Sequence, residues 1–246
     1  MRKVVATFGG KAYDETTEKL IRSFGSVIVF DDRWLCESGY VSRNQWLFDA
    51  WSPSSVDNPK PVQHGFGWCS WKAFVISSAM KFVNHLDVVM YVDADCYPVA
   101  PFGNLFDECV AAGGVLLFDE TVSNARFTKA DCMVAMGLPV ADGPHACGRF
   151  SLWQKGSFLA RQMLTEWWAY SINPRCTLWD SSVLVKDPQE YYRNSTEQSV
   201  LSNLAIKYKL PLHSPIDGEG TPGQLFQQVW CTGDRSDLSG SIYRNV

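Results

Sequence analysis

The chain of 246 residues contains no cluster of lysines and arginines and no excess of positive charge. Its formal net charge is -4 and its isoelectric point is about 5.6. Proteins that bind duplex nucleic acid usually present a basic surface, because contacts with phosphates supply much of their affinity. The composition therefore argues against nucleic acid as a partner.

Long apolar runs are also missing. No stretch approaches the roughly 20 apolar residues that a membrane-spanning helix needs. The start of the chain, MRKVVATFGGKAYDE, reaches polar residues too early for a signal peptide. We therefore expect a soluble, cytoplasmic protein with no membrane span.

The eight cysteines include no C-x-x-C pair. They are scattered over positions 36, 69, 96, 109, 132, 147, 176 and 231, and several lie inside apolar runs. Zinc sites and disulfide frameworks use closer and more regular spacings. The pattern favours reduced thiols within a hydrophobic core.

Segments with strand and helix patterns alternate along the chain, in which 46% of the residues are hydrophobic and 20% charged. Strands are expected at 4–10, 26–32, 88–92 and 114–120, and helices at 14–24, 65–83, 104–111, 156–170 and 199–208. Residues 33–61 are expected to be irregular, and residues 218–240 to form loops and short strands. The alternation predicts an α/β fold with a mostly parallel central sheet flanked by helices, in a single domain.

The segment VVMYVDADCYP, from Val88 to Pro98, carries the clearest chemical signal. Its apolar run predicts a strand buried on both faces, which ends at Asp93 and Asp95 with only Ala94 between them. In α/β proteins, ligands bind at this carboxyl edge of the sheet. Two carboxylates separated by one small residue can be aimed at one hard cation, Mg²⁺ or Mn²⁺, which in turn binds a diphosphate. The alternative is a strand end closed by solvated, turn-forming aspartates.

The order of segments resembles a known family, the metal-dependent nucleotide-sugar glycosyltransferases with the single-domain GT-A fold, especially bacterial and viral polysaccharide-type members. Five segments carry the resemblance: VVATFGG, GWCSWKAFVI, YVDADCYP, ACGRFSLWQKGSFLARQMLTEWW and STEQSVLSNLAIKY. It implies one Rossmann-like transferase domain over residues 1–246, with the nucleotide-binding half at about 1–100 and the half that binds sugar and acceptor at about 101–246. The sequence departs from the family pattern at Ala73, where proline is expected, and at Glu197, where aspartate is common.

The resemblance also implies ligands and the residues that bind them. The donor would be a nucleotide diphosphate sugar, with UDP favoured, the acceptor a glycan or glycoprotein, and the cofactor Mn²⁺ or Mg²⁺. Asp95 would coordinate the metal, and Asp93 would bind the metal or the ribose. The other donor-binding residues that it implies are Thr7, Phe8, Trp71, Lys72, Ala94, Gly148 and Gln198.

Glu197 is the first candidate for the catalytic residue. By resemblance it would approach the reacting carbon, either as general base for the acceptor hydroxyl or as a contact to the donor sugar. Because Ser195 and Thr196 precede it at a predicted helix start, a capping role also fits. Asp119 is the rival base, and His213 is a candidate third metal ligand that could equally be structural.

Two other functions compete with glycosyl transfer. A Mg²⁺-dependent phosphatase of the haloacid dehalogenase type also places an aspartate pair after an apolar strand, although its pair normally lies near the amino terminus and is followed by threonine. A non-catalytic carbohydrate-binding protein is suggested by the ten tryptophans, since aromatic faces pack on sugar rings. Metal-dependent binding of UDP or GDP separates the three.

Overall fold

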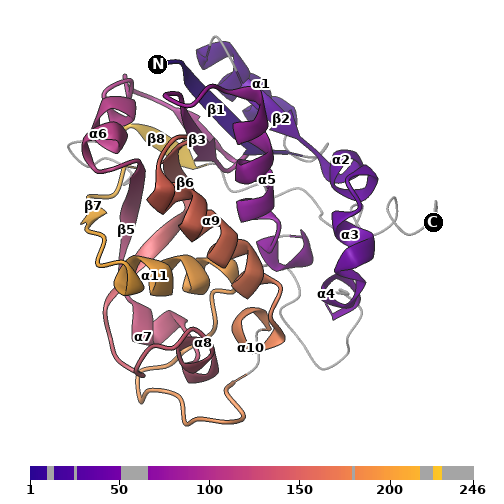
Figure 1. Cartoon of the computed structure of the whole chain (residues 1–246), viewed down its shortest axis with the longest axis vertical. Coiled ribbons are helices and arrows are strands. Elements are labelled where there is room, and N and C mark those ends of the chain that lie inside the picture. The colour runs from indigo at the N-terminus through magenta and orange to yellow at the C-terminus, as the bar shows by residue number, and fades with distance from the viewer. Residues whose placement is uncertain (10–13, 25–26, 51–65, 179–180, 217–223, 229–246) are drawn as a thin grey trace.

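A computed structural model gives the structure of the chain (Figure 1). It describes residues 1–246 except 10–13, 25–26, 51–65, 179–180, 217–223 and 229–246. Helices and strands alternate along the chain in the order that the sequence predicts.

The centre of the molecule is a six-stranded sheet in the order β2-β1-β3-β6-β5-β7. Its strands are β1 (Lys3–Phe8), β2 (Val27–Phe30), β3 (Val88–Val92), β5 (Val115–Ser123), β6 (Pro144–Gln154) and β7 (Leu212–His213). β1 pairs in parallel with β2 and β3, and β5 with β7, whereas β6 runs antiparallel between β3 and β5. The predicted α/β fold with a mostly parallel central sheet is confirmed.

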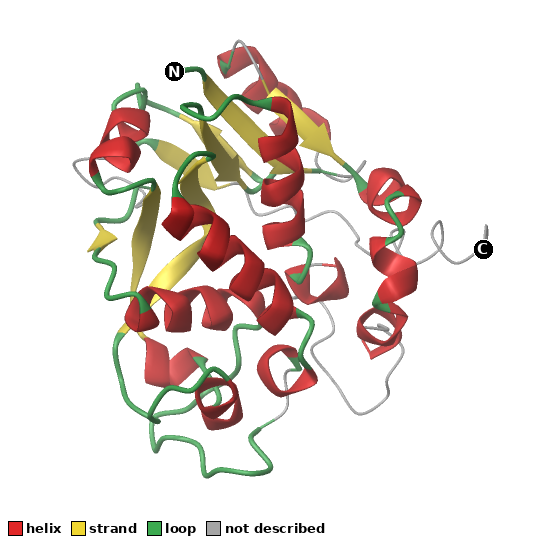
Figure 2. Cartoon of the chain, in the orientation of Figure 1, coloured by secondary structure: helices red, strands yellow, loops and turns green. Residues whose placement is uncertain are grey.

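Helices cover both faces of this sheet (Figure 2). The α-helices are α1 (Asp14–Ser23), α2 (Asp32–Glu37), α3 (Tyr40–Arg43), α4 (Gln45–Ala50), α5 (Lys72–Ala79), α6 (Leu105–Ala111), α7 (Asn124–Phe127), α8 (Ala130–Ala135), α9 (Phe158–Ser171), α10 (Pro174–Thr177) and α11 (Glu197–Lys207). Short 3-10 helices are η2 (Phe66–Cys69) and η3 (Met80–Phe82). Buried residues of α5, α9 and α11 form a core with one face of the sheet, and those of α1 and α6 form a core with the other.

The packing of the central strand β3 explains why its residues are apolar at every position. Val88, Met90 and Val92 pack into the core with α1 and α6, whereas Val89 and Tyr91 pack into the core with α5 and α9. Because side chains alternate along a strand, a strand between two helix layers needs apolar residues at every position. The burial of β3 therefore places its carboxyl end, and the aspartates after it, at the rim of the sheet.

Part of the segment expected to be irregular is helical. Residues 32–50 form α2, α3 and α4, and the rest of 33–61 lies outside the described residues. Asp31 caps α2 by accepting a hydrogen bond from the backbone N–H of Trp34 at 2.7 Å. Leu35, Tyr40 and Leu47 are fully buried. The helical spacing of these apolar residues therefore outweighs the tendency of neighbouring residues to break a helix.

The helix expected at 65–83 begins later, at Lys72, and gives way to η3 at Met80. Gly67, Trp68 and Cys69 have φ values of 56°, 58° and 54°, in the left-handed region that favours glycine. Three such residues in succession turn the chain sharply before α5. This turn was not predicted from the sequence. The turn brings the carbonyl of Trp68 close to the hydroxyl of Thr196, the residue before α11.

A second, two-stranded sheet joins β4 (Cys96–Pro98) to β8 (Phe226–Gln228) in antiparallel register. β8 lies within the segment 218–240, most of which is outside the described residues. The pairing places Gln228 opposite Cys96, and thus brings the late part of the chain back to the turn that contains the paired aspartates.

No helix in the described part of the chain is both long enough and apolar enough to cross a membrane. Seven of the cysteines are described, all are free thiols, and five of them are buried: Cys96, Cys109, Cys132, Cys147 and Cys176.

A buried polar network ties β6 to α7 and α11. The Nδ1 atom of His145 lies 3.1 Å from Asn124 Oδ1 and 3.0 Å from Ser202 Oγ. Its Nε2 atom is buried without a hydrogen-bond partner among the described residues. Burial and, secondly, the charge of Arg193 lower the pKa of His145 to about 4, so the ring is neutral at physiological pH.

Replacing His145 with glutamine is expected to flatten the pH dependence of stability. The ordinary histidine pKa is 6.5 and the folded value about 4, so below pH 6.5 the unfolded chain takes up a proton that the folded chain does not. Wild type should therefore lose about 2 kcal/mol between pH 7 and pH 5 through this group. Urea unfolding of both proteins at the two pH values checks this, and equal losses would contradict it.

Candidate functional site

The paired aspartates lie in a tight turn at the carboxyl end of β3. The backbone N–H of Asp93 donates to the carbonyl of Arg149 on β6 at 2.9 Å, and the N–H of Cys96 donates to the carbonyl of Asp93 at 3.0 Å. Ala94 is almost fully buried between the two acids. Backbone hydrogen bonds therefore hold the turn, so the two carboxylates can form contacts with other groups.

Both oxygens of Asp93 have partners from the protein. The hydroxyl of Tyr91 donates to Oδ1 at 2.7 Å. The ammonium group of Lys72 lies 3.0 Å from each carboxylate oxygen. Tyr91 and Asp93 are two residues apart, so the alternation of the strand directs both side chains to the same face. Asp93 is thus fixed in orientation.

Lys72, the first residue of α5, is buried and joins three groups. Besides Asp93, its Nζ donates to the carbonyl of Gly148 at 3.0 Å and lies 3.3 Å from Oε1 of Glu197. Burial lowers the pKa of Lys72, but the two carboxylates outweigh it, and the net pKa lies well above the ordinary value. Lys72 therefore stays charged, and its three N–H donors are all used within the protein.

Glu197 opens α11 and is also buried, with its side chain 6% exposed. Its Oε2 accepts a hydrogen bond from the hydroxyl of Thr196 at 2.7 Å. Neither this partner nor Lys72 is a backbone N–H of the helix, so the carboxylate shows no capping bond. Burial raises the pKa of Glu197 despite the opposing charge of Lys72. A buried carboxylate with a raised pKa takes up a proton more readily than an exposed carboxylate does.

The backbone before Glu197 is strained. Thr196 has φ 56° and ψ -121°, a conformation rare for a β-branched residue. Its hydroxyl lies within 3.1 Å of the carbonyl of Trp68, in the left-handed turn before α5. Two unusual backbone conformations thus meet beside the carboxylate of Glu197. Such strain persists only where the surroundings impose it, and it concentrates at functional sites.

Asp95 has a different environment from Asp93. The amide of Gln228 donates to Oδ2 at 2.9 Å, and the thiol of Cys96 lies 3.4 Å from Oδ1. Burial, and next the charge of Asp93, raise the pKa of Asp95. A carboxylate next to another acid, with only neutral hydrogen-bond partners, is a favourable place for a cation.

A second polar cluster adjoins the first around Gly148. Arg149 forms an ion pair with Glu120 at 2.9 Å, and the amide of Gln198 lies 3.3 Å from the same glutamate. A Cβ atom on Gly148 would lie 3.2 to 3.4 Å from the side chain of Gln198. The β6 register shifts against β5 between Leu117 and Asp119, which places this irregular stretch beside the carboxyl end of β3.

The residues expected to bind the donor base lie next to this site but are buried. Phe8 and Trp71 stack on each other, with ring centroids 3.8 Å apart and an angle of 28°. Thr7 is fully buried, and its hydroxyl has no hydrogen-bond partner in the part of the chain that the structure covers. A Cβ atom on Gly9 would lie 3.1 Å from Ala94, so the end of β1 directly contacts the turn of the paired aspartates.

Two predicted residues lie apart from these contacts. Asp119, on β5, accepts a hydrogen bond from the N–H of Thr121 at 2.8 Å. His213, on β7, pairs with Phe118 on β5. β7 is three strands from β3, which corresponds to roughly 14 Å across the sheet. Among the described residues, no group of three or more histidine, cysteine or acidic side chains is arranged to hold a metal ion. Roles for Asp119 and His213 stay predictions.

Tyr91, Thr196 and Gln228 belong to the site without having been predicted. The strand alternation already put Tyr91 on the same face as Asp93, so that signal was available. Thr196 was interpreted only as part of a helix cap. Gln228 carries no local signal, because its contact with Asp95 depends on a pairing between segments 133 residues apart.

No family model matches the chain, and no curated protein sequence matches it. Structure comparison finds similar solved chains. One is the apo structure of the bifunctional glycosyltransferase WbbM, with a TM-score of 0.48 and 10% identity over 81% of this chain and 36% of that one. A glycosyltransferase involved in glycosylating the major capsid of PBCV-1 has a TM-score of 0.48 and 12% identity, over 98% and 99% of the two chains.

A third similar structure is apo mouse xyloside xylosyltransferase 1, with a TM-score of 0.42 and 10% identity, over 87% of this chain and 84% of that one. The chain thus spans about a third of the length of the WbbM chain.

Proposed function

We propose that the chain is a glycosyltransferase that uses a divalent cation to transfer a sugar from a nucleotide diphosphate sugar, with UDP favoured, to a glycan or other hydroxyl acceptor. One observation carries the proposal: Asp93, Asp95, Lys72 and Glu197, from three separate elements, converge at the carboxyl end of β3. This combines a cation site with a buried carboxylate of raised pKa.

The oxygen atoms at the aspartate turn fit Mg²⁺ or Mn²⁺. Both are hard cations that prefer carboxylates and other oxygen ligands. Mg²⁺ is usually bound through one or two carboxylates together with substrate phosphates and water, so a complete cage of protein ligands is not needed. Asp95 would bind the cation directly, and Asp93, held by Lys72 and Tyr91, would bind it or the ribose. A bound cation would stabilise negative charge on the departing diphosphate.

Glu197 is the residue that we assign to proton transfer. Its raised pKa favours the uptake of a proton. The hydrogen bond from the hydroxyl of Thr196 holds its Oε2 atom in place. Transfer to a hydroxyl releases a proton, which Glu197 would accept as general base. Lys72 positions Glu197 and Asp93 relative to each other through its two ion pairs.

The two alternative functions fit the geometry less well. An aspartate-based phosphatase normally has its aspartate pair near the amino terminus, with threonine after it, whereas here the pair follows β3, the third strand along the chain, and Cys96 comes after Asp95. For a carbohydrate-binding protein, aromatic faces should be open to the glycan. Within the described part of the chain, Trp68, Trp71, Trp153 and Trp167 are buried, which favours a core role for most of these rings.

Replacing Asp95 with alanine tests the proposal. We expect Mn²⁺-dependent affinity for UDP or GDP to fall by about 100-fold, because loss of a direct ligand should cost at least as much as loss of a supporting group. Calorimetric titration with and without Mn²⁺ measures this. Asp119→Ala, the same change on β5, which is separated from β3 by β6, is the control and should bind normally. Unchanged affinity in Asp95→Ala would rule out the assigned cation site.

Replacing Gln228 with leucine is expected to weaken the same binding by roughly 10-fold, since the amide orients Asp95 without being the predicted ligand itself. Gln227→Leu is a matched control, because Gln227 accepts a hydrogen bond from Tyr97 rather than contacting Asp95. If the two variants bind nucleotide and Mn²⁺ equally well, β8 has no part in the site.

A further inference from the structure

An exposed apolar surface lies near the amino end of β3, whereas the candidate site lies at the carboxyl end of the same strand. Phe82, Leu86 and Phe158 have exposed fractions of 66%, 64% and 73%. Phe82 ends η3, Leu86 lies in the turn before β3, and Phe158 begins α9. Exposed apolar side chains that gather on one surface can mark an interaction site. We call these three residues the apolar edge.

The segments that carry the apolar edge are fixed to one another. Leu86 and Phe158 both line a cavity of about 500 Å³. A Cβ atom on Gly156 would lie 2.6 Å from the ring and the carbonyl of His85, so only glycine allows this close approach. The guanidinium of Arg2 donates to the carbonyl of Phe82 at 3.3 Å. The apolar side chains are therefore presented by a rigid support.

Basic residues lie close to the apolar edge in sequence. Lys81 and Arg161 are exposed and neighbour Phe82 and Phe158 in sequence or one helical turn away. The ammonium group of Lys155 donates to the carbonyl of Val83, in the same turn as Leu86. The acid of this turn, Asp87, is buried and paired with Arg2 at 3.0 Å, so its charge is compensated. The surface thus has a basic character although the whole chain is acidic.

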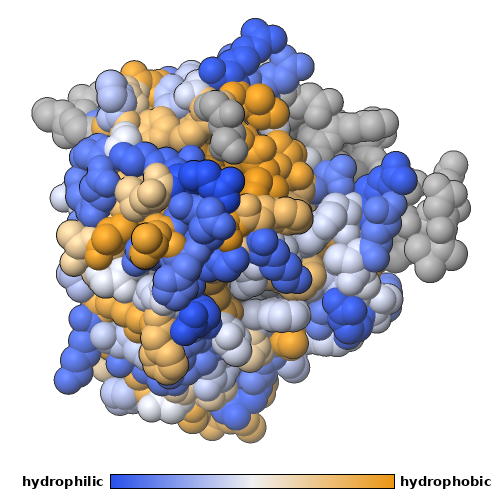
Figure 3. Space-filling view, turned by 45° about the horizontal axis from the view of Figure 1, so that its top comes forward, coloured by the Kyte–Doolittle hydropathy of each residue, from blue (hydrophilic) through white to orange (hydrophobic). Residues whose placement is uncertain are grey.

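We propose that the apolar edge docks the protein on the surface of an anionic lipid membrane. Exposed phenylalanine and leucine side chains can enter the boundary between headgroups and acyl chains. Lysines and arginines around them are attracted to anionic headgroups, each by about 10-fold or less in affinity. Figure 3, in which the top of Figure 1 comes forward, shows hydrophobic side chains bordered by hydrophilic ones on this face. Charge complementarity favours a lipid surface over a protein partner.

Docking of this kind leaves the candidate site open. β3 begins directly after the turn with Leu86 and ends directly before Asp93, and its five residues span roughly 16 Å. The membrane would lie at the amino end of the strand and the nucleotide site at the carboxyl end. The proposal is therefore independent of the function assigned to that site, and variants in the apolar edge should keep nucleotide binding.

Flotation of the purified protein with vesicles tests this inference. We expect binding to phosphatidylcholine vesicles that contain phosphatidylserine, weaker binding to pure phosphatidylcholine, and a decrease as salt is raised. In the triple variant Phe82→Ser, Leu86→Ser, Phe158→Ser, binding should fall by at least about 10-fold, because three apolar side chains no longer insert. The far-ultraviolet circular dichroism spectrum and the melting temperature check that the variant is folded.

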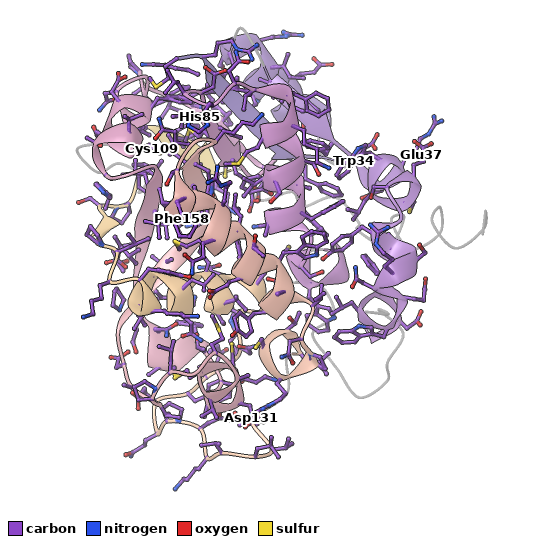
Figure 4. All side chains as sticks on the ribbon, viewed as in Figure 1. Trp34, Glu37, His85, Cys109, Asp131 and Phe158 are labelled. Atoms are coloured by element: carbon purple, nitrogen blue, oxygen red, sulfur yellow. The ribbon has the colours of Figure 1, made fainter. Side chains whose placement is uncertain are left out.

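The matched control is Val183→Ser with Leu184→Ser, a pair with exposed fractions of 82% and 66%. Asp131 holds the backbone of this pair by accepting hydrogen bonds from both N–H groups. Figure 4 labels Asp131 near the bottom of the molecule and His85 near its top. The control should float like wild type. The proposal is overturned if wild type does not float, if the control loses as much binding as the triple variant, or if the triple variant instead abolishes a dimer seen by sedimentation.

Discussion

Replacing Lys72 with methionine is expected to destabilise the fold by about 3–5 kcal/mol, because it leaves the buried Glu197 and the half-buried Asp93 without their shared counter-charge. The deficit should be largest at neutral pH. Burial already raises the pKa of Glu197, and loss of Lys72 raises it further, so protonation on acidification neutralises the unpaired carboxylate. Urea unfolding between pH 8 and pH 5 measures both the loss and its partial recovery.

The chain offers a matched control for this experiment. Lys3 also forms an ion pair with an aspartate at 3.0 Å, but its side chain is 40% exposed and that of Asp107 is 67% exposed. Lys3→Met should cost less than about 1 kcal/mol, as exposed pairs usually do. Adding Glu197→Gln to Lys72→Met should restore part of the stability, because one of the two unpaired charges is removed. If Lys72→Met and Lys3→Met lower the free energy of unfolding equally, Lys72 does not act as a buried counter-charge.

Glu197→Gln is expected to lower sugar transfer by roughly 10²- to 10⁴-fold with donor affinity little changed, since glutamine keeps the size of the side chain but cannot accept the proton. The hydrogen bond from Thr196 can persist to the amide oxygen, and so can the contact of Lys72 with Asp93. Turnover and nucleotide binding should be measured on the same preparation, so that loss of base function is separated from loss of folding.

Glu120→Gln is the control for the general base, because Glu120 lies in the neighbouring cluster with Arg149 and Gln198. We expect it to change turnover by less than about 10-fold. Near-normal turnover in Glu197→Gln would remove this residue as the base. Asp119, or a departing phosphate that itself takes the acceptor proton, would then become the leading candidate.

Local patterns predicted much of this architecture. The apolar run of β3 and the aspartates after it were recognisable because burial on both faces leaves no polar position until the strand ends. The helix at α9 was predicted from its spacing and begins with a serine cap at Ser157. The importance of Glu197 was inferred through family resemblance, and the structure adds its contacts with Lys72 and Thr196.

Features that depend on distant partners escaped prediction. The antiparallel position of β6 between β3 and β5 is set by pairing across the sheet, and no residue within β6 encodes its neighbours. The left-handed conformation of Trp68 and Cys69 runs against their intrinsic preferences and is imposed by packing. Lys72 was predicted only as a donor-binding residue, and its ion pairs were not predicted, because its two carboxylate partners lie 21 and 125 positions further along the chain.

The return of β8 to the aspartate turn gives the site an order of assembly. Asp95 leaves the ribosome 133 residues before Gln228, the residue that orients it. Contacts between such distant segments form late, because a long loop must first close. A nascent chain that has made β3, α5 and even α11 therefore still lacks the contact of Gln228 with Asp95, on which the proposed cation site depends. We therefore expect nucleotide affinity to appear only after Gln228 has been synthesised, so that shorter nascent chains bind the donor weakly.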